Sequence, residues 1–265
     1  MLLGLSICLL VAGSACTPAT VTVRQFPSTP DAVRALRGGT VEAVYGDYPA
    51  MAYAARESVG TLEVVRRQFD TANFGIAIAQ DATELQAAVT AALSAIIGDG
   101  SYDRIIGAWA LRGGHLDAPE GAGSVPEASA VPQLADGTLT VGMEISFAPM
   151  GFNDEAGQLA GVDVEIARAL GERLGVEVAF ENTEFDSLFG ALGSGTIDIA
   201  MSAITVTDER RGQVHFVEYL QSGSAILVQT GNPQSIEFPA QLCGRSVGVQ
   251  EGTVQAETLG SFPCQ

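Results

Sequence analysis

The chain has 265 residues, of which 47% are hydrophobic, enough for one large domain or two lobes with a buried core. Its 13 basic and 31 acidic side chains give a formal net charge of -18, which repels a phosphate backbone, so we expect no nucleic-acid partner. The absence of lysine excludes Schiff-base and P-loop chemistry that requires this side chain. His115 and His215 have no cysteine or second histidine nearby at ligand spacing. We therefore expect binding without a metal or a cofactor rather than catalysis.

The first residues predict an export signal. Met1 to Val11 is apolar, too short to span a bilayer, and is followed by small residues up to Cys16. Residues 1–16 resemble a bacterial lipoprotein signal with a lipid on Cys16, although Gly13 stands where such signals usually have an aliphatic residue. Simple secretion after Ala15 and an apolar N-terminal helix remain alternatives. We expect a periplasmic or cell-surface protein, with or without a lipid anchor.

The positions of the four cysteines are consistent with export to an oxidising compartment. Cys8 lies inside the predicted signal and Cys16 at its end, which leaves Cys243 and Cys264 as an even pair. In an oxidising compartment such a pair predicts a disulfide bond. Two buried free thiols are the alternative.

After the signal, short β-branched runs alternate with helical patterns, which predicts an α/β fold on a largely parallel sheet. Residues 113–135 are rich in Gly, Pro, Ala and Ser and have no apolar periodicity, which predicts a flexible linker. Before the linker we expect a helix over 31–36, strands over 41–45 and 74–79, a helix over 81–97 and a short helix over 102–109. After it we expect strands over 139–143, 176–180, 197–204, 224–228 and 246–250, and helices over 161–174, over 185–192 and after Thr253.

Sequence motifs on both sides of the linker resemble one family. The motifs after it are LTVGMEISFAPMGFNDEAGQLAGVDVEIARALGERLGVEV, FDSLFGALGSGTIDIAMSAITVTDERR, HFVEYLQSGSAILV and LCGRSVGVQEGT. Through them residues 138–265 resemble the N-terminal half of the bacterial extracellular solute-binding proteins, family 3, which serve amino-acid ABC transporters. Residues 21–111 resemble the C-terminal half, through FPSTPDAVRALRGGTVEAVYGDYPAMAY, FGIAIAQDATELQAAV and DGSYDRIIGAWA.

The two halves stand in reversed order. Joined the other way round they make one copy of the family, which predicts a circular permutation, and a fragment of a tandem array is the alternative. The resemblance implies a two-lobed, periplasmic-binding-protein-like fold of type II with a ligand cleft between the lobes. The implied larger lobe combines 139–225 with 76–111, the smaller combines 228–265 with 21–73, and the hinge lies near 225–229 and 71–77.

The resemblance also implies an amino-acid site. Arg210, in ITVTDER, matches the arginine that binds the ligand carboxylate, and Asp47 matches the acid that pairs with the ammonium. A forked donor and a fixed carboxylate suit these two groups. Thr205 and the backbone of Ala203 match positions that hydrogen-bond the same ligand. The alternatives are a solvated surface arginine for Arg210 and a turn-forming residue for Asp47.

Further positions match groups around the ligand. Phe147 and Phe185 match the aromatic pair that sandwiches the ligand side chain, although composition alone would place either in the core. Glu144 matches a position that contacts the side chain and would favour a cationic one; a solvated glutamate is the alternative. Gly252 and Thr253 open a helix after a strand, where amide groups can meet an anion or serve as a plain N-cap.

These residues predict a monomeric binding protein that captures a polar or charged amino acid for an ABC permease. An enzyme on the same scaffold is an alternative from another class, since some relatives are dehydratases, and Glu144 would be its acid or base. A sensor component that presents its ligand to a receptor is a third. Retention of both Arg210 and Asp47 favours capture.

Overall fold

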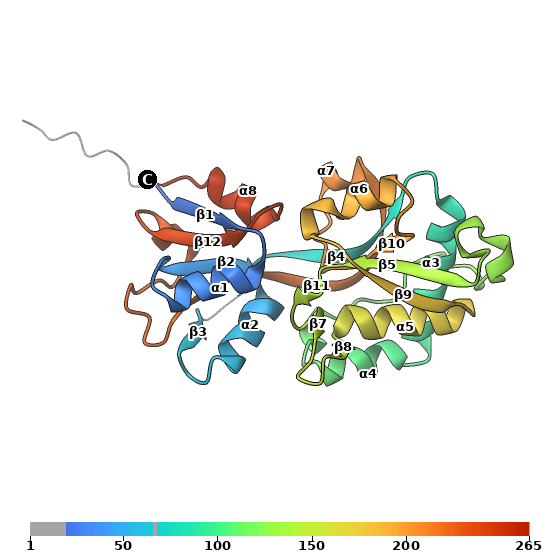
Figure 1. The fold of residues 1–265 in the computed structure, drawn as a ribbon, viewed down its shortest axis with the longest axis horizontal. Coiled ribbons are helices and arrows are strands. Elements are labelled where there is room, and N and C mark those ends of the chain that lie inside the picture. Colours follow the sequence, from blue (N-terminus) through green and yellow to red (C-terminus); the bar gives the residue numbers. More distant parts are fainter. Residues whose placement is uncertain (1–19, 66–67, 265) are drawn as a thin grey trace, which may run out of the picture.

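A computed structural model describes residues 20–65 and 68–264, and within them the chain forms two lobes (Figure 1). The predicted signal over 1–16, with Cys8 and Cys16, lies outside the described residues. Across those described ranges no helix is both long and apolar enough to cross a membrane.

The smaller lobe combines segments from the beginning and the end of the described chain (Figure 1). Its strands follow the order β1-β12-β2-β11, with β3 on β11; β1 and β2 run parallel to β12, whereas β11 runs antiparallel to β2. Helices α1 and α8 contact β12, and α2 contacts β11. Its elements are β1 (Thr22–Phe26), α1 (Thr29–Arg37), β2 (Ala43–Asp47), α2 (Tyr48–Glu57), β3 (Leu62–Val64), η5 (Pro239–Leu242), β12 (Ser246–Gln250), α8 (Val254–Gly260) and the last residues of β11 (Val214–Gln229).

The larger lobe continues the same sheet in the order β11-β4-β10-β5-β9. Helices α3, α4 and α5 pack against one another, and α6 packs against β10 and β4. In Figure 1, α6 and α7 lie above the sheet, with α4 and α5 below it. The elements are β4 (Phe69–Ala79), α3 (Thr83–Gly98), α4 (Ser101–Ala108), β5 (Thr138–Met143), α5 (Val162–Leu174), β9 (Glu177–Asn182), η4 (Phe185–Ser187), α6 (Leu188–Gly193), β10 (Ile199–Ala200) and α7 (Asp208–Arg211), with a small sheet of β6 (Ser146–Phe147), β7 (Gly151–Asn153) and β8 (Leu159–Ala160).

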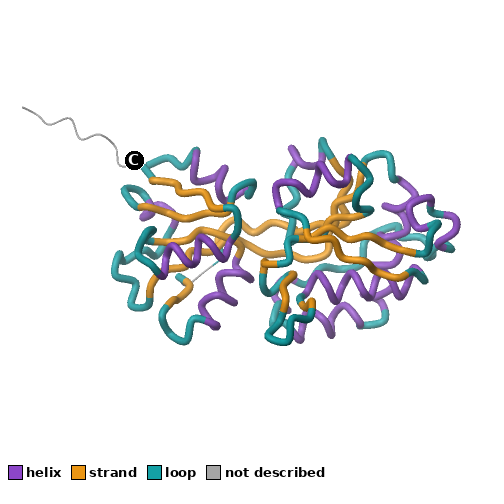
Figure 2. The backbone as a smooth tube through the Cα atoms, viewed as in Figure 1, coloured by secondary structure: helices purple, strands orange, loops and turns teal. Residues whose placement is uncertain are grey.

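Strands β4 and β11 run antiparallel from one lobe to the other (Figure 2). Residues 214–224 of β11 pair with β4, whereas 224–229 pair with β2 and β3 of the smaller lobe. The pairing register shifts between Glu218 and Leu220 and again between Ser222 and Ser224. The strand that we expected over 224–228 is therefore the end of a 16-residue strand.

Three other expectations differ from the structure. The segment 113–135 is not a free linker at its end, because Val131 and Leu134 are each 1% exposed and pack into the core beside short 3-10 turns. The expected strand over 197–204 is reduced to β10, since the backbone turns at Ala203 with a φ of 48°. The expected helix over 185–192 begins with the 3-10 turn η4 before α6.

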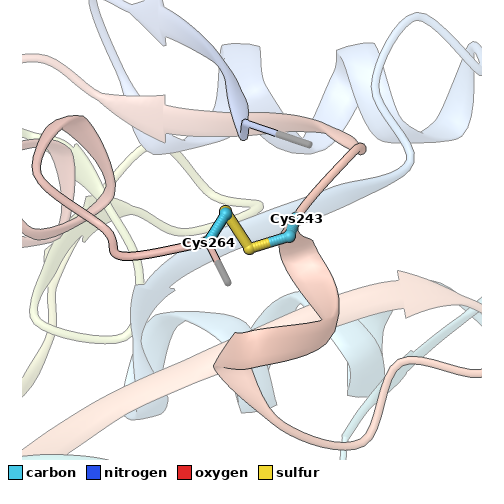
Figure 3. The surroundings of a disulfide bond; sticks show 2 residues. All are labelled: Cys243 and Cys264. Carbon is cyan, nitrogen blue, oxygen red and sulfur yellow. A yellow bond between two sulfur atoms is a disulfide. The ribbon is translucent and has the colours of Figure 1, made fainter. Parts of the chain in front are cut away.

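The disulfide between Cys243 and Cys264 is confirmed (Figure 3). Cys243 follows η5 and Cys264 follows α8, with Cα atoms 5.7 Å apart. The bond ties the segment after α8 to the loop before β12, and so restrains the part of the smaller lobe that carries α8.

Candidate functional site

A small cavity opens between the lobes where β2 and β12 of the smaller lobe end. Phe147 and Phe185 reach it from the larger lobe, so the structure brings this predicted aromatic pair to one place. Phe147 is 6% exposed and also packs in the hydrophobic core. The residues from the smaller lobe are Thr29, Val44, Tyr45, Gly46, Asp47, Gln250, Thr253 and Gln255.

Asp47 lies at the end of β2, opposite Ser224 of β11. It precedes α2, yet its side chain makes no capping hydrogen bond, so the simple turn role is not the one it has here. Gln255 Nε2 donates to Asp47 Oδ1 over 2.8 Å and to Ser224 Oγ over 2.9 Å. Burial raises the pKa of Asp47 to about 7, against the opposing effects of the Gln255 hydrogen bond and the Arg210 charge.

Arg210, on α7 of the larger lobe, reaches both lobes. Its Nη1 donates to the Thr205 carbonyl over 2.8 Å, and its Nη2 donates to the Gly252 carbonyl of the smaller lobe over 2.9 Å. The guanidinium carbon lies 5.7 Å from the centre of the Phe185 ring, close enough for a cation–π contact. Burial lowers the pKa of Arg210, and nearby acids, first among them Glu257, act in the opposite direction.

The charges of Arg210 and Asp47 have no ion-pair partner within 20–65 and 68–264. Asp47 lines the small cavity described above, whereas Arg210 lines a second cavity with Gly252 and Glu257, and Phe185 lines both. Two charges of opposite sign that are desolvated but unpaired favour a ligand that carries both complementary charges.

Glu144 is 8% exposed, so it is not a solvated strand-end residue. Its Oε1 accepts from Ser146 Oγ over 2.7 Å, and its Oε2 accepts from Gln250 Nε2 over 2.5 Å. Because Gln250 ends β12, the second bond crosses between the lobes. Burial raises the pKa of Glu144, opposed by these two hydrogen bonds.

The backbone around Ala203 differs from the expectation in one respect. The Ala203 N–H donates to Asp163 Oδ2 over 3.0 Å and is therefore not free for a ligand, which leaves the carbonyl as the group that could meet one. Thr205 is 8% exposed and forms a β-bridge with Phe74 of β4. Its backbone carbonyl receives the Arg210 bond described above.

Gly252 and Thr253 connect β12 to α8. Gly252 has a φ of 70°, a left-handed conformation that favours glycine, and a Cβ at this position would lie 3.2 Å from the Cβ of Asp186 in the other lobe. Thr253 Oγ1 accepts from the Ala256 N–H, so it caps α8. The plain N-cap interpretation is thus realised at Thr253, while its side chain also lines the cavity.

Sequence reasoning missed four polar residues that organise the site: Thr29, Gln250, Gln255 and Asp163. Gln250, Gln255 and Asp163 are buried, with exposures of 6%, 3% and 0%. The available signal was a polar side chain within an otherwise buried apolar pattern, as in Val162-Asp163-Val164 of α5. Among the described residues no group of three His, Cys, Asp or Glu side chains could hold a metal ion.

Comparisons with known proteins relate the second half of the chain to one family. The sequence profile of the bacterial extracellular solute-binding proteins, family 3, matches residues 139–258. Over these residues the chain is similar to that family. The L-cystine-binding protein TcyJ of Escherichia coli (strain K12) is 38% identical over 124 residues, which cover 46% of this chain and 47% of the relative. The arginine-binding protein ArgT of Corynebacterium glutamicum is 35% identical over 140 residues, covering 53% and 44%.

The chain spans about half the length of the curated family relatives it matches. A solved structure, an ancestral arginine-binding protein bound to arginine, is 47% identical over 29% of this chain and 34% of its own, with a TM-score of 0.29.

Proposed function

We propose that this protein captures a free amino acid in the cleft between its lobes and presents it to an ABC permease. The observation that carries the proposal is the pair Arg210 and Asp47, which lack ion-pair partners in the described chain and line two cavities that share Phe185. The ligand carboxylate would bind the Arg210 guanidinium, and the ammonium would bind Asp47. Charge-assisted hydrogen bonds of this kind are among the strongest in proteins.

The division of these groups between the lobes links binding to closure. A ligand held by both Arg210 and Asp47 gains contacts in the closed arrangement that neither lobe supplies alone, so it shifts the population towards closure. Gly252 and Thr205, whose carbonyls accept from Arg210, would keep the guanidinium fork directed at the cleft. Closure around the ligand would be the form that the permease recognises.

The environment of the ligand side chain favours a polar or cationic amino acid. Phe147 and Phe185 would cover its faces, and Glu144 supplies a buried carboxylate close to the cavity. Relatives named as binding proteins for L-cystine and arginine support this class of ligand. Release of the Gln250–Glu144 bond would free a carboxylate oxygen for a cationic side chain.

Binding without catalysis fits the site better than a dehydratase activity. Glu144 is the acid or base that such an enzyme would use. Arg210 and Asp47, in contrast, suit the two charged groups that every free amino acid carries. Export, with or without a lipid on Cys16, would place the cleft outside the cytoplasmic membrane, where an importer collects its substrates.

Thermal unfolding in the presence of each common amino acid tests the function. A ligand that binds the folded state at one hundred times its Kd stabilises it by about 2.7 kcal/mol, which gives a clear rise in the midpoint. Isothermal titration of the active compounds should then give one site per chain. If no amino acid raises the midpoint of thermal unfolding, the proposal is rejected.

We also infer that the chain is a circular permutant of the family. The parallel pairing of β1 with β12 supports this, because a segment near the beginning of the chain completes a sheet formed near its end. A permutant closes both lobes within one chain, whereas a fragment of an array would complete them with a second chain. Light scattering at low concentration should show a monomer that binds one ligand; an obligate dimer would favour the array fragment.

A further inference from the structure

A buried carboxylate stands behind the cleft without facing it. Asp163, in the first turn of α5, is 0% exposed. Its Oδ1 accepts from the Tyr219 hydroxyl over 2.6 Å, and its Oδ2 accepts from the Ala203 N–H over 3.0 Å. No arginine or histidine lies within ion-pair distance of it in the described part of the chain.

Burial of the Asp163 carboxylate does not stabilise the fold in the way that burial of an apolar side chain does. Desolvation of a carboxylate is unfavourable, and hydrophobic replacement of buried charged groups is often neutral or stabilising. Burial accordingly raises the pKa of Asp163 to about 6, although both hydrogen bonds oppose the shift. The role of Asp163 must therefore be sought in the conformation of the two groups that it binds.

The first of these groups is the loop that carries ligand contacts. Ala203 has a φ of 48°, a left-handed conformation that is unfavourable by about 1 kcal/mol for a residue with a Cβ. The Asp163 bond holds its N–H in this conformation. Two residues later, the Thr205 carbonyl fixes Arg210 Nη1, so the direction of the guanidinium depends on where the loop lies.

The second group belongs to a crossover strand. Tyr219 is 0% exposed and lies on β11 where the register with β4 shifts between Glu218 and Leu220. Asp163 thus joins the loop at Ala203 to a strand that runs into both lobes. The Tyr219 carbonyl in turn accepts from the hydroxyl of Tyr102, which in the described part of the chain makes no hydrogen bond to Asp163 or Ala203.

We propose that Asp163, held by Tyr219, is a positioning residue of the amino-acid site: it fixes the Ala203–Thr205 backbone, and through it Arg210, in the arrangement that binds the ligand carboxylate. This inference rests on the proposed function. It adds residues that do not touch the ligand but determine the affinity for it.

The chain offers a matched pair of substitutions. Tyr219→Phe and Tyr102→Phe each remove one hydroxyl from a fully buried tyrosine of the larger lobe. The first removes a hydrogen bond to Asp163, and the second removes one to the Tyr219 carbonyl and one from the Leu116 N–H. Both should lower the unfolding midpoint, so stability alone does not separate them.

Isothermal titration with the amino acid that binds the wild type separates them. Tyr219→Phe and Asp163→Ala should raise Kd by about tenfold, the equivalent of one hydrogen bond to a charged group. Tyr102→Phe should leave Kd within about twofold, and Asp163→Asn should recover most of the affinity, because its amide can accept from Ala203 and donate to the Tyr219 oxygen. If Asp163→Ala does not fold, the two tyrosine variants decide.

Hydrogen–deuterium exchange gives a readout that needs no ligand. The Ala203 amide should exchange faster in Tyr219→Phe than in Tyr102→Phe at equal unfolding free energy. A Tyr219→Phe variant with wild-type Kd, or equal weakening by both tyrosine variants, would overturn the proposal. A wild type that binds no amino acid would reject the proposed function instead, and the exchange at Ala203 would then decide whether Asp163 holds the loop.

Discussion

Replacement of Arg210 by alanine separates affinity from stability. In the free protein its guanidinium donates to two carbonyls, those of Thr205 and Gly252, in a cleft that water can enter once the side chain is removed. Each neutral acceptor can then bind water, so we expect the free energy of unfolding to fall by no more than about 2 kcal/mol. The ligand carboxylate, in contrast, would lose its only cationic partner.

The loss of affinity follows from that difference. Truncation of one side of a buried, hydrogen-bonded ion pair weakens binding by about 2–5 kcal/mol, which corresponds to an increase in Kd of roughly 30-fold to 5,000-fold. The cation–π contact of Arg210 with the Phe185 ring is already present without a ligand, so its loss, about 0.5–1 kcal/mol, belongs to the fall in stability and not to the loss of affinity.

Arg211 provides the matched control. It is the next residue on α7, and its guanidinium pairs with Glu218 at the surface. Arg211→Ala should change stability by less than about 1 kcal/mol and leave Kd unchanged, because exposed ion pairs contribute little. Isothermal titration and urea unfolding of both variants are the assays. An Arg210→Ala protein that is folded and binds within threefold of the wild type would refute the reasoning.

Asp47 should make binding pH-dependent, because burial raises its pKa to about 7. The folded protein therefore favours the protonated carboxyl and loses stability as the pH rises from about 4 to 7. The affinity for an ammonium group rises over the upper part of that range, because the ligand binds the ionised carboxylate. Titration calorimetry at pH 6 in buffers of different ionisation enthalpy should detect proton release. Replacement of Cys243 and Cys264 by serine should lower the free energy of unfolding in urea by about 3 kcal/mol, as expected for a loop of 21 residues. Gly161→Ala should destabilise by more than about 3 kcal/mol, because its φ is 134° and its Cβ would overlap the Met150 carbonyl, whereas Gly157→Ala, with a φ of 74° and open space around its Cβ, should lose only about 1 kcal/mol in the same assay.

Local patterns predicted the elements whose burial is regular. The helix expected over 161–174 is α5 (Val162–Leu174), because its apolar residues repeat at helical spacing and Gly175 ends it in a left-handed conformation. The strand expected over 139–143 is β5 (Thr138–Met143), buried on both faces. In both cases neighbouring residues alone determine the element.

Elements that depend on distant contacts were predicted less well. The apolar run 197–204 reads as one strand, but the chain leaves the sheet after Ala200, and the turn at Ala203 is held by Asp163, which lies 40 residues earlier in the sequence. Likewise, hydrophobicity does not reveal that β11 extends through both lobes. The lengths of these segments are set by tertiary pairing, which overrides local propensity.

In the candidate site, too, features with a local sequence pattern were predicted and features that depend on distant contacts were not. Arg210 and Asp47 could be proposed because motifs around them resemble a family, but the residues that orient them could not. Gln255 reaches Asp47 from a helix 208 positions away in the sequence. Hydrogen bonds of this range leave no local pattern, except that a polar residue occupies a position where the helix is otherwise buried.

The position of the candidate ligand groups relative to the crossover strands bears on how the cleft would close. Asp47 pairs directly with Ser224 of β11, and Thr205 pairs with Phe74 of β4. Both contacts therefore adjoin the strands about which the lobes would rotate, and groups close to an axis move little during rotation. Closure by bending near the register shifts of β11 would then preserve the spacing of the charged groups, while the distant rims, including the Tyr53 and Phe152 rings 5.5 Å apart, would move most.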